Sequence, residues 1–81
     1  MKNLYVGNLP HSTTEPELRG LFEAHGAVEK VSIVTDRETG RPKGFGFCEF
    51  DNENSAQQAV QTLNGAEFMG RSIRVDYANS R

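Results

Sequence analysis

The residues of this chain that are best suited to chemistry lie in the segment KGFGFCEF, residues 43–50. Successive side chains of a β-strand point to opposite faces, so Phe45 and Phe47 would share one face. The charged Lys43 and Glu49 fall in the same phase, whereas the two glycines, the cysteine and the last phenylalanine fall on the opposite face. Flat rings flanked by charge suit unpaired nucleobases, because each base stacked on an aromatic side chain contributes about 1–3 kcal/mol to binding.

The charges decide which face of this strand is expected to be buried. Burying the face with the two rings would also bury Lys43 and Glu49, and unpaired buried charges cost more than buried rings gain. We therefore expect Phe45 and Phe47 to face solvent, although each exposed ring forgoes about 1.5–3 kcal/mol of burial. Tyr5, in an alternating segment near the N-terminus, is expected beside them. Clustered exposed rings on a bare sheet are typical of a binding site.

Local patterns predict the elements that position these rings. Thr14 and Glu17 have the spacing of a capping box, which marks the start of a helix. Gly26 is expected to end this helix, with His25 in its last turn. Period-two alternation predicts strands, and apolar residues spaced by three and four predict helices. The expected order is strand 3–9, helix 14–26, strand 28–36, strand 43–50, helix 51–65 and strand 72–78.

This order predicts an α+β fold, a βαββαβ two-layer sandwich of the ferredoxin-like type. We expect one domain over residues 1–81 with its core in 3–78. Two helices can cover only one face of a four-stranded antiparallel sheet, and the glycines of the third strand would let them approach closely, with Phe50 adding bulk at the strand end. The covered face should carry the aliphatic side chains Leu4, Val6, Ile33, Ile73 and Val75.

Composition restricts the classes of function. A single cysteine, Cys48, excludes an internal disulfide and a cysteine-based zinc site, and its phase makes it a buried apolar side chain. No apolar run approaches the length of a membrane span. The chain also lacks a phosphate-binding loop and a catalytic constellation, so we predict no enzyme, no cofactor and no metal.

The net charge of −2 and the isoelectric point near 5.6 do not by themselves favour nucleic acid. The two predicted helical segments, however, carry one basic residue against five acidic ones, which leaves eight basic against six acidic residues elsewhere. We therefore expect an acidic helical side and a mildly basic sheet.

Polar residues around the rings complete the predicted site. Lys43 and Arg74 flank the rings and are expected to meet phosphates. Two arginines in the turn before the third strand could close over the same ligand, and an asparagine and an aspartate at strand ends could read base edges by hydrogen bonding. The predicted binding residues are Tyr5, Phe45, Phe47, Lys43, Asn8, Arg37, Arg41, Arg74 and Asp76.

The segment KGFGFCEF resembles the octamer of the RNA recognition motif, K/R-G-F/Y-G/A-F-V-x-F/Y, at seven of eight places, with Cys48 where valine is usual. LYVGNL, residues 4–9, is similar to the hexamer on the first strand of that family, and the resemblance extends over residues 3–78. It implies that Tyr5 and Phe45 stack on bases, that Phe47 packs against sugars and that Lys43 contacts a phosphate. Within the family, the chain is similar both to the domain of a cleavage-stimulation-factor-like subunit and to single-domain bacterial members.

The expected partner is single-stranded RNA, with about two to four nucleotides on the sheet and micromolar affinity, and with weaker binding of single-stranded DNA. We expect a monomer that is not at a membrane and serves RNA processing or regulation, in the nucleus if eukaryotic and in the cytoplasm if bacterial. The alternative is a protein-interaction module that uses the acidic helical face. The retained rings argue against this alternative, as does Ile73, which stands where one protein-binding group carries a phenylalanine.

Overall fold

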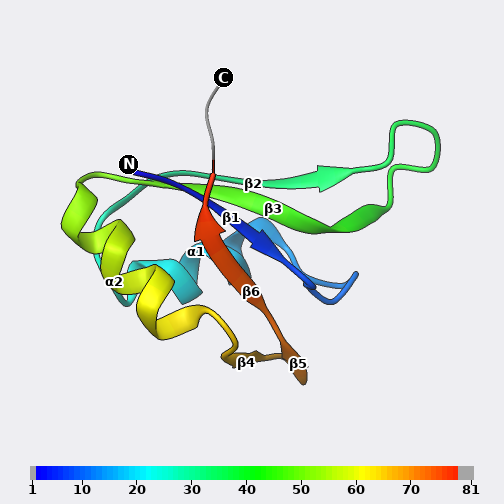
Figure 1. The fold of residues 1–81 in the computed structure, drawn as a ribbon. Helices are drawn as coiled ribbons and strands as arrows, with labels where there is room; N and C mark the ends of the chain where they lie inside the picture. Colours follow the sequence, from blue (N-terminus) through cyan, green and yellow to red (C-terminus); the bar gives the residue numbers. More distant parts are fainter. Residues whose placement is uncertain (1, 79–81) are drawn as a thin grey trace.

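The structure is a computed structural model, and it describes residues 2–78. Its main sheet has four antiparallel strands in the order β2-β3-β1-β6, and both helices cover one face of it (Figure 1). No helix of residues 2–78 covers the other face, so the predicted α+β sandwich is confirmed. The elements are β1 (Asn3–Gly7), α1 (Glu15–Glu23), β2 (Val28–Thr35), β3 (Pro42–Phe50), α2 (Glu53–Leu63), β4 (Glu67–Phe68), β5 (Arg71–Ser72) and β6 (Arg74–Tyr77).

Helix α1 begins where the capping box predicted. The Thr14 hydroxyl accepts a hydrogen bond from the Glu17 N–H, and the Glu17 carboxylate accepts one from the Thr14 N–H at 2.9 Å. The helix ends at Glu23, earlier than Gly26, and His25 therefore lies beyond its last turn. The prediction was wrong here because the chain tightens into a 3₁₀-type turn, in which the His25 N–H donates to the Phe22 carbonyl at 2.9 Å.

Helix α2 is shorter than predicted at both ends because asparagines cap it. The Asn52 side chain accepts a hydrogen bond from the Ser55 N–H at 2.9 Å, which fixes the start at Glu53. At the other end, the Asn64 side chain accepts from the Val75 N–H at 3.1 Å and so ties the helix end to β6. Neither helix in residues 2–78 is long and apolar enough to span a membrane.

The core lies between the helices and the covered face of the sheet. Phe22 of α1 and Phe50 of β3 meet edge to face, with ring centroids 5.9 Å apart, and neither is exposed. Ile33 is only half-buried because it lies on β2, an outer strand of the sheet. The other four predicted core residues of the sheet are buried, and the full buried apolar set is Leu4, Val6, Leu9, Leu18, Phe22, Val28, Cys48, Phe50, Ala56, Ala59, Leu63, Ile73 and Val75.

The first and last predicted strands were too long. Strand β1 ends at Gly7 because Asn8 adopts a left-handed conformation with φ 59°. The predicted strand 72–78 is interrupted at Ile73, and Ser72 belongs instead to a two-stranded hairpin of β4 and β5. Met69 and Gly70 connect this hairpin with φ values of 52° and 87°, as a two-residue turn of type I′ requires.

The glycines of β3 do not serve to bring helices close, so that interpretation was wrong. A Cβ atom on Gly46 would collide with the carbonyl oxygen of Ser32 and lie 3.2 Å from the Ile33 Cα. The close neighbour of Gly46 is therefore the backbone of β2. Gly44 has φ +91° and faces the segment after β1, with the Leu9 carbonyl oxygen 3.4 Å from a Cβ built there.

Candidate nucleic-acid interface

Three rings gather on the open face of the sheet, and we call them the ring triad: Tyr5, Phe45 and Phe47. Tyr5 and Phe47 are direct cross-strand partners on β1 and β3, with ring centroids 6.0 Å apart. Phe45 lies 5.9 Å from Tyr5 and 6.3 Å from Phe47. Phe47 is 39% exposed and the other two are half-buried, whereas no other phenylalanine of β3 is exposed. The rings thus form one partly exposed aromatic surface.

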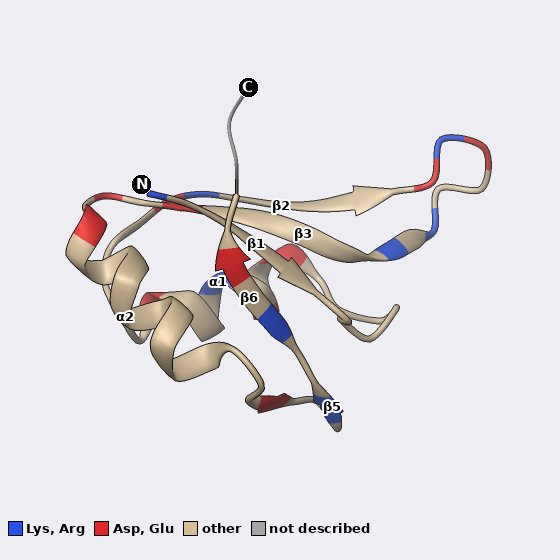
Figure 2. Cartoon of the chain, viewed as in Figure 1, with Lys and Arg blue, Asp and Glu red and all other residues tan. Residues whose placement is uncertain are grey.

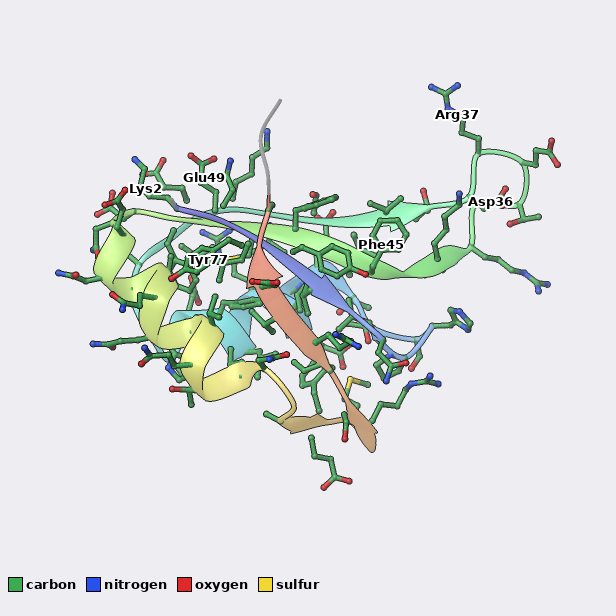
Figure 3. The ribbon with its side chains drawn as sticks, in the orientation of Figure 1. Lys2, Asp36, Arg37, Phe45, Glu49 and Tyr77 are labelled. Carbon is green, nitrogen blue, oxygen red and sulfur yellow. The ribbon has the colours of Figure 1, made fainter. Side chains whose placement is uncertain are left out.

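The strand register identifies the neighbours of the ring triad. Ser32 of β2 and Asp76 of β6 stand in the same row as Phe47 and Tyr5. In the next row, Lys30, Glu49 and Asn3 lie side by side on three strands. Figure 3 shows Phe45 and Glu49 on the side of the sheet that is turned away from the helices.

A shallow hollow of about 330 Å³ opens beside Phe47. Its lining comes from β1, β2, β3 and the residue after β6: Asn3, Lys30, Ser32, Phe47, Cys48, Glu49 and Ala78. An apolar ring next to amide, hydroxyl and charged groups can hold a flat polar heterocycle, by stacking on one side and by hydrogen bonds at its edge. The open face therefore offers both a platform and a polar border.

Gly7 sets the orientation of Tyr5, a role that strand alternation did not reveal. The tyrosine ring lies along β1 over Gly7, so a Cβ atom at Gly7 would be 2.9 Å from the ring Cζ and would collide with the hydroxyl. Any side chain at this position would lift the ring from the strand. The glycine two residues after Tyr5, within the predicted strand 3–9, was the available signal.

Strand β3 bulges at its start, and this changes the interpretation of Lys43. Gly46 pairs with Ile33, but Pro42 pairs with Thr35, so three residues of β3 stand opposite one residue of β2. The positive φ of Gly44 produces this irregularity. Simple alternation therefore relates Glu49 to the two phenylalanines but does not extend to Lys43. Lys43 is exposed at the edge of the bulge.

The loop between β2 and β3 is ordered by one carboxylate. Asp36 Oδ1 accepts hydrogen bonds from the N–H groups of Glu38 at 2.8 Å and of Thr39 at 3.2 Å. The Asp36 N–H donates to the Arg41 carbonyl at 2.7 Å and closes the loop. Arg37 projects from the far end of this loop, away from the sheet (Figure 3). Arg37 and Arg41 are both exposed, so both cations are available to a ligand at this end of the sheet.

Asn8 lies at the other edge of the site and already has partners. Its side-chain N–H donates to the Ser72 carbonyl at 2.7 Å, and its oxygen accepts from Arg71 at 2.8 Å. These bonds hold β5 against the end of β1, which favours a positioning role over base reading. Arg74 pairs with Gly7 on the same edge. Arg71 was not among the predicted residues, and the only sequence signal for it was the GR pair before the last strand.

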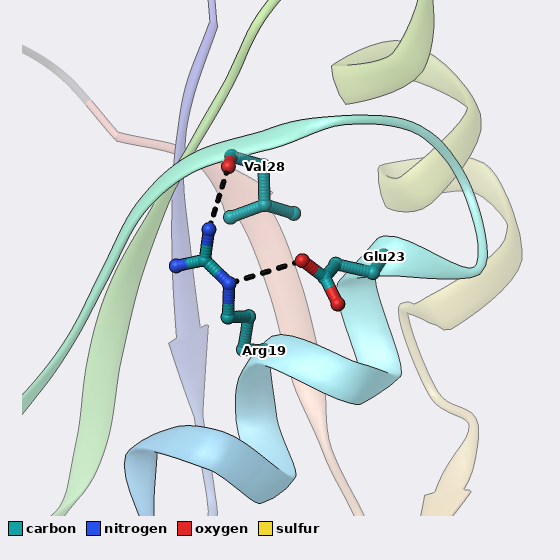
Figure 4. A network of polar contacts seen from close by, with 3 residues as sticks. All are labelled: Arg19, Glu23 and Val28. Atoms are coloured by element: carbon teal, nitrogen blue, oxygen red, sulfur yellow. Dashed lines mark hydrogen bonds and ion pairs between the residues drawn. The ribbon is translucent and has the colours of Figure 1, made fainter.

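Charge is distributed as the sequence predicted. Lys and Arg mark the start of β3 and β5, the β2–β3 loop and β6 carry both signs of charge, and acidic residues mark the starts of both helices (Figure 2). Arg19, the basic residue of α1, is committed to Glu23 at 3.0 Å and to the Val28 carbonyl at 3.0 Å (Figure 4). The outer helical side is therefore acidic, and the cations near the rings belong to the sheet and its loops.

The comparisons with known proteins agree with this geometry. A family model described as "RNA recognition motif" matches residues 4–74. This chain belongs to the RNA recognition motif family. That family is a non-catalytic RNA-binding family, so membership confirms the prediction that the chain is not an enzyme.

Two relatives and one structure show the range of the similarity. The chain is 46% identical over 80 residues to the human cleavage stimulation factor subunit 2 tau variant, covering 99% of this chain but only 13% of that protein. It is also 46% identical over 79 residues to the putative RNA-binding protein RbpE of Nostoc, covering 98% of this chain and 80% of RbpE. A solved Sxl-lethal protein/RNA complex aligns with a TM-score of 0.93 and 35% identity, over 99% of this chain and 48% of that one.

Cys48 is where this RNA recognition motif departs from the usual octamer. Its side chain is 1% exposed, and burial raises the pKa of the thiol to about 12. A thiol that stays protonated is a poor nucleophile, so Cys48 is a small apolar core residue, as its phase predicted. The departure is confined to the covered face and leaves the ring triad unchanged. Among residues 2–78 no cluster of three or more potential metal ligands occurs.

Proposed function

We propose that this domain binds single-stranded RNA across the open face of its sheet, with bases stacked on Tyr5 and Phe45 and a sugar packed against Phe47. The observation that carries the proposal is the ring triad, in which three rings with centroids 5.9–6.3 Å apart stay partly exposed on a face without helices. An exposed ring that contributes little to the core is best explained by a ligand that covers it. Membership in the RNA recognition motif family supports RNA as that ligand.

The exposed cations near the sheet support phosphate contacts at two places in this proposal. Lys43, Arg41 and Arg37 lie at the β2–β3 end of the sheet, and Arg74 lies at its β6 edge. Asp76 stands in the row of Tyr5 and can accept a hydrogen bond from a base edge. Since few cations flank the rings, stacking supplies most of the affinity, and about 8 kcal/mol in total corresponds to about 1 μM. Single-stranded DNA, which lacks the 2′-hydroxyl, binds more weakly in this account.

The relatives suggest the kind of process served. One relative is named a cleavage stimulation factor subunit, another a putative RNA-binding protein, and one similar structure contains RNA. We place this domain in post-transcriptional RNA processing or regulation inside the cell, as a monomer. The chain spans about an eighth of the length of the cleavage-factor relative, so the activity of that larger protein is not transferred to it.

The test compares aromatic residues on the two sides of the sheet. Phe45→Ala/Phe47→Ala should weaken binding of a short random RNA pool at least about thirtyfold, because two contacts of about 1–3 kcal/mol each are lost. Tyr77→Ala is the matched control, because Tyr77 is similarly exposed at 36% but pairs with the buried Leu4 and lies on the helical side (Figure 3). Fluorescence anisotropy measures both variants. Equal losses in the two, or unchanged binding in the double variant, would contradict the proposal.

A further inference from the structure

A second hollow lies at the end of the sheet from which the β2–β3 loop projects, and we call it the end hollow. It is lined by His11, Asp36, Thr39, Arg41, Pro42 and Lys43. Two segments far apart in sequence meet there: the turn after β1, and the β2–β3 loop with the first residues of β3 that follow it. Two of the lining side chains carry a permanent positive charge, and a third is an imidazole.

The position of His11 is fixed by the bulge of β3. The Leu9 N–H donates to the Gly44 carbonyl at 2.8 Å, which ties the turn after β1 to the bulge. A Cβ atom on Gly44 would lie 3.7 Å from His11 Nε2, so the edge of the imidazole rests against this glycine. His11 therefore stands beside the strand between Lys43 and Phe45, although it is distant from both in sequence.

The balance of charge and donors in the lining favours an anion. Asp36 is the only acidic residue of the lining, and its Oδ1 accepts two backbone hydrogen bonds within the loop. The Thr39 hydroxyl and the imidazole can each donate a hydrogen bond, and histidine donates to a phosphate whether neutral or charged. Arg41 and Lys43 supply charge, and guanidinium and ammonium groups are the usual partners of phosphate oxygens.

We propose that the end hollow takes one internucleotide phosphate of an RNA strand as that strand leaves the ring triad past Phe45. Arg41 and Lys43 supply the charge, and His11 supplies a hydrogen-bond donor from outside the sheet. This inference rests on the proposed function, because the stacked bases deliver the strand to this end. It adds a contact from the turn after β1 and makes His11 a binding residue.

The test replaces single phosphates and single side chains together. A short RNA is synthesised with a neutral methylphosphonate at each linkage in turn, and each is bound to the full chain by fluorescence anisotropy. With the unmodified protein, a methylphosphonate at one particular linkage should weaken binding about fivefold, which is the range of one well-placed exposed charge contact. A methylphosphonate at the other linkages should have a smaller effect. In His11→Ala and in Arg41→Ala the methylphosphonate at the sensitive linkage should weaken binding clearly less than it does with the unmodified protein, because each variant lacks one of the groups that contact the phosphate.

Two variants separate this site from diffuse charge. Arg37→Ala removes the same charge from the same loop, but Arg37 does not line the end hollow. In this variant, a methylphosphonate at the sensitive linkage should therefore weaken RNA binding as much as it does with the unmodified protein. His11→Gln keeps a side-chain N–H donor and should retain part of this effect. Both His11 and Arg41 are exposed, so thermal unfolding should be unchanged in all four variants.

The outcomes distinguish this inference from the proposed function. The coupling to look for is a methylphosphonate effect at one linkage that His11→Ala or Arg41→Ala reduces. If no linkage shows this coupling, or if every linkage shows it equally, the end hollow is not a phosphate site even though the rings bind RNA. Inorganic phosphate titrated alone is the second arm: NMR shifts at His11 and Thr39 without coupling to any linkage would mean a free-anion site and would overturn the assignment to RNA. Failure of the unmodified protein to bind any RNA would overturn the proposed function and this inference with it.

Discussion

Phe47 and Phe50 lie three residues apart on one strand and have opposite environments. Phe47 is 39% exposed on the open face, whereas Phe50 is fully buried under the helices. The geometry of their aromatic contacts is nearly the same: Phe47 lies 6.0 Å from Tyr5 at 64°, and Phe50 lies 5.9 Å from Phe22 at 79°. Ring packing therefore does not distinguish a core from a binding surface. Access to solvent does, because the same residue type stabilises the fold on one face and is left available to a ligand on the other.

The largest expected difference between the two faces is in stability. Phe50→Ala should lower the free energy of unfolding by about 3–5 kcal/mol, since it leaves a cavity in the closed core. Phe47→Ala should change it by no more than about 1 kcal/mol, because part of this ring is already in water. Urea unfolding followed by circular dichroism measures both. Similar losses would mean that the open face is part of the core.

The buried thiol on the covered face should make the free energy of unfolding depend on pH. The Cys48 thiol keeps a pKa of about 12 in the folded protein against 9.0 for an ordinary thiol. Below pH 9 both states hold the proton, and above it the unfolded state loses the proton first, so stability should fall as pH rises from about 9 towards 12. The slope from this group is at most about 1.4 kcal/mol per pH unit.

Cys48→Val is the control for this titration because it keeps an apolar side chain in the core. Urea unfolding at several pH values should give a steeper decline for the unmodified protein than for the variant. Parallel curves would show that the thiol is not protected by burial.

A smaller effect is expected from the residue that orients Tyr5. Gly7→Ala should lift the tyrosine ring and weaken RNA binding by a few-fold, about 1 kcal/mol, while the other two rings stay in place. Gly40→Ala is a useful comparison: Gly40 has a positive φ, but a Cβ there meets no neighbour and the residue lies in the loop. RNA affinity by anisotropy and the Tyr5 ring signals by NMR report the result. Unchanged ring signals in Gly7→Ala would contradict this role for the glycine.

The parts of the fold that local signals control could be predicted from the sequence. The capping box of Thr14 and Glu17 placed the start of α1, and the aliphatic phases of β1 and β6 identified the covered face. The charge of Glu49, which shares the phase of Phe45 and Phe47, correctly predicted that both rings lie on the open face. These features depend on residues close together in sequence, whose spacing carries the information.

The errors came from contacts between distant segments. The bulge at Gly44 depends on how β2 and the turn after β1 meet β3, so alternation within β3 could not reveal it. Gly46 makes room for the backbone of β2, which spacing within β3 could not reveal. The hairpin of β4 and β5 was missed because Met69 takes a turn position that glycine or asparagine usually occupies. The partners of Asn8 on β5 lie 63 and 64 residues away along the chain, so the sequence could not reveal them.

The central claim is that the open face binds RNA and the helical face does not. An NMR titration of the ¹⁵N-labelled chain with a short random RNA pool tests it directly, because every backbone amide reports on its own position. We predict shifts at Tyr5, Phe45, Phe47 and their row neighbours Ser32 and Asp76, with the amides of α1 and α2 unchanged. Shifts confined to the helices, or none on the sheet, would contradict the account and favour a protein partner on the acidic face.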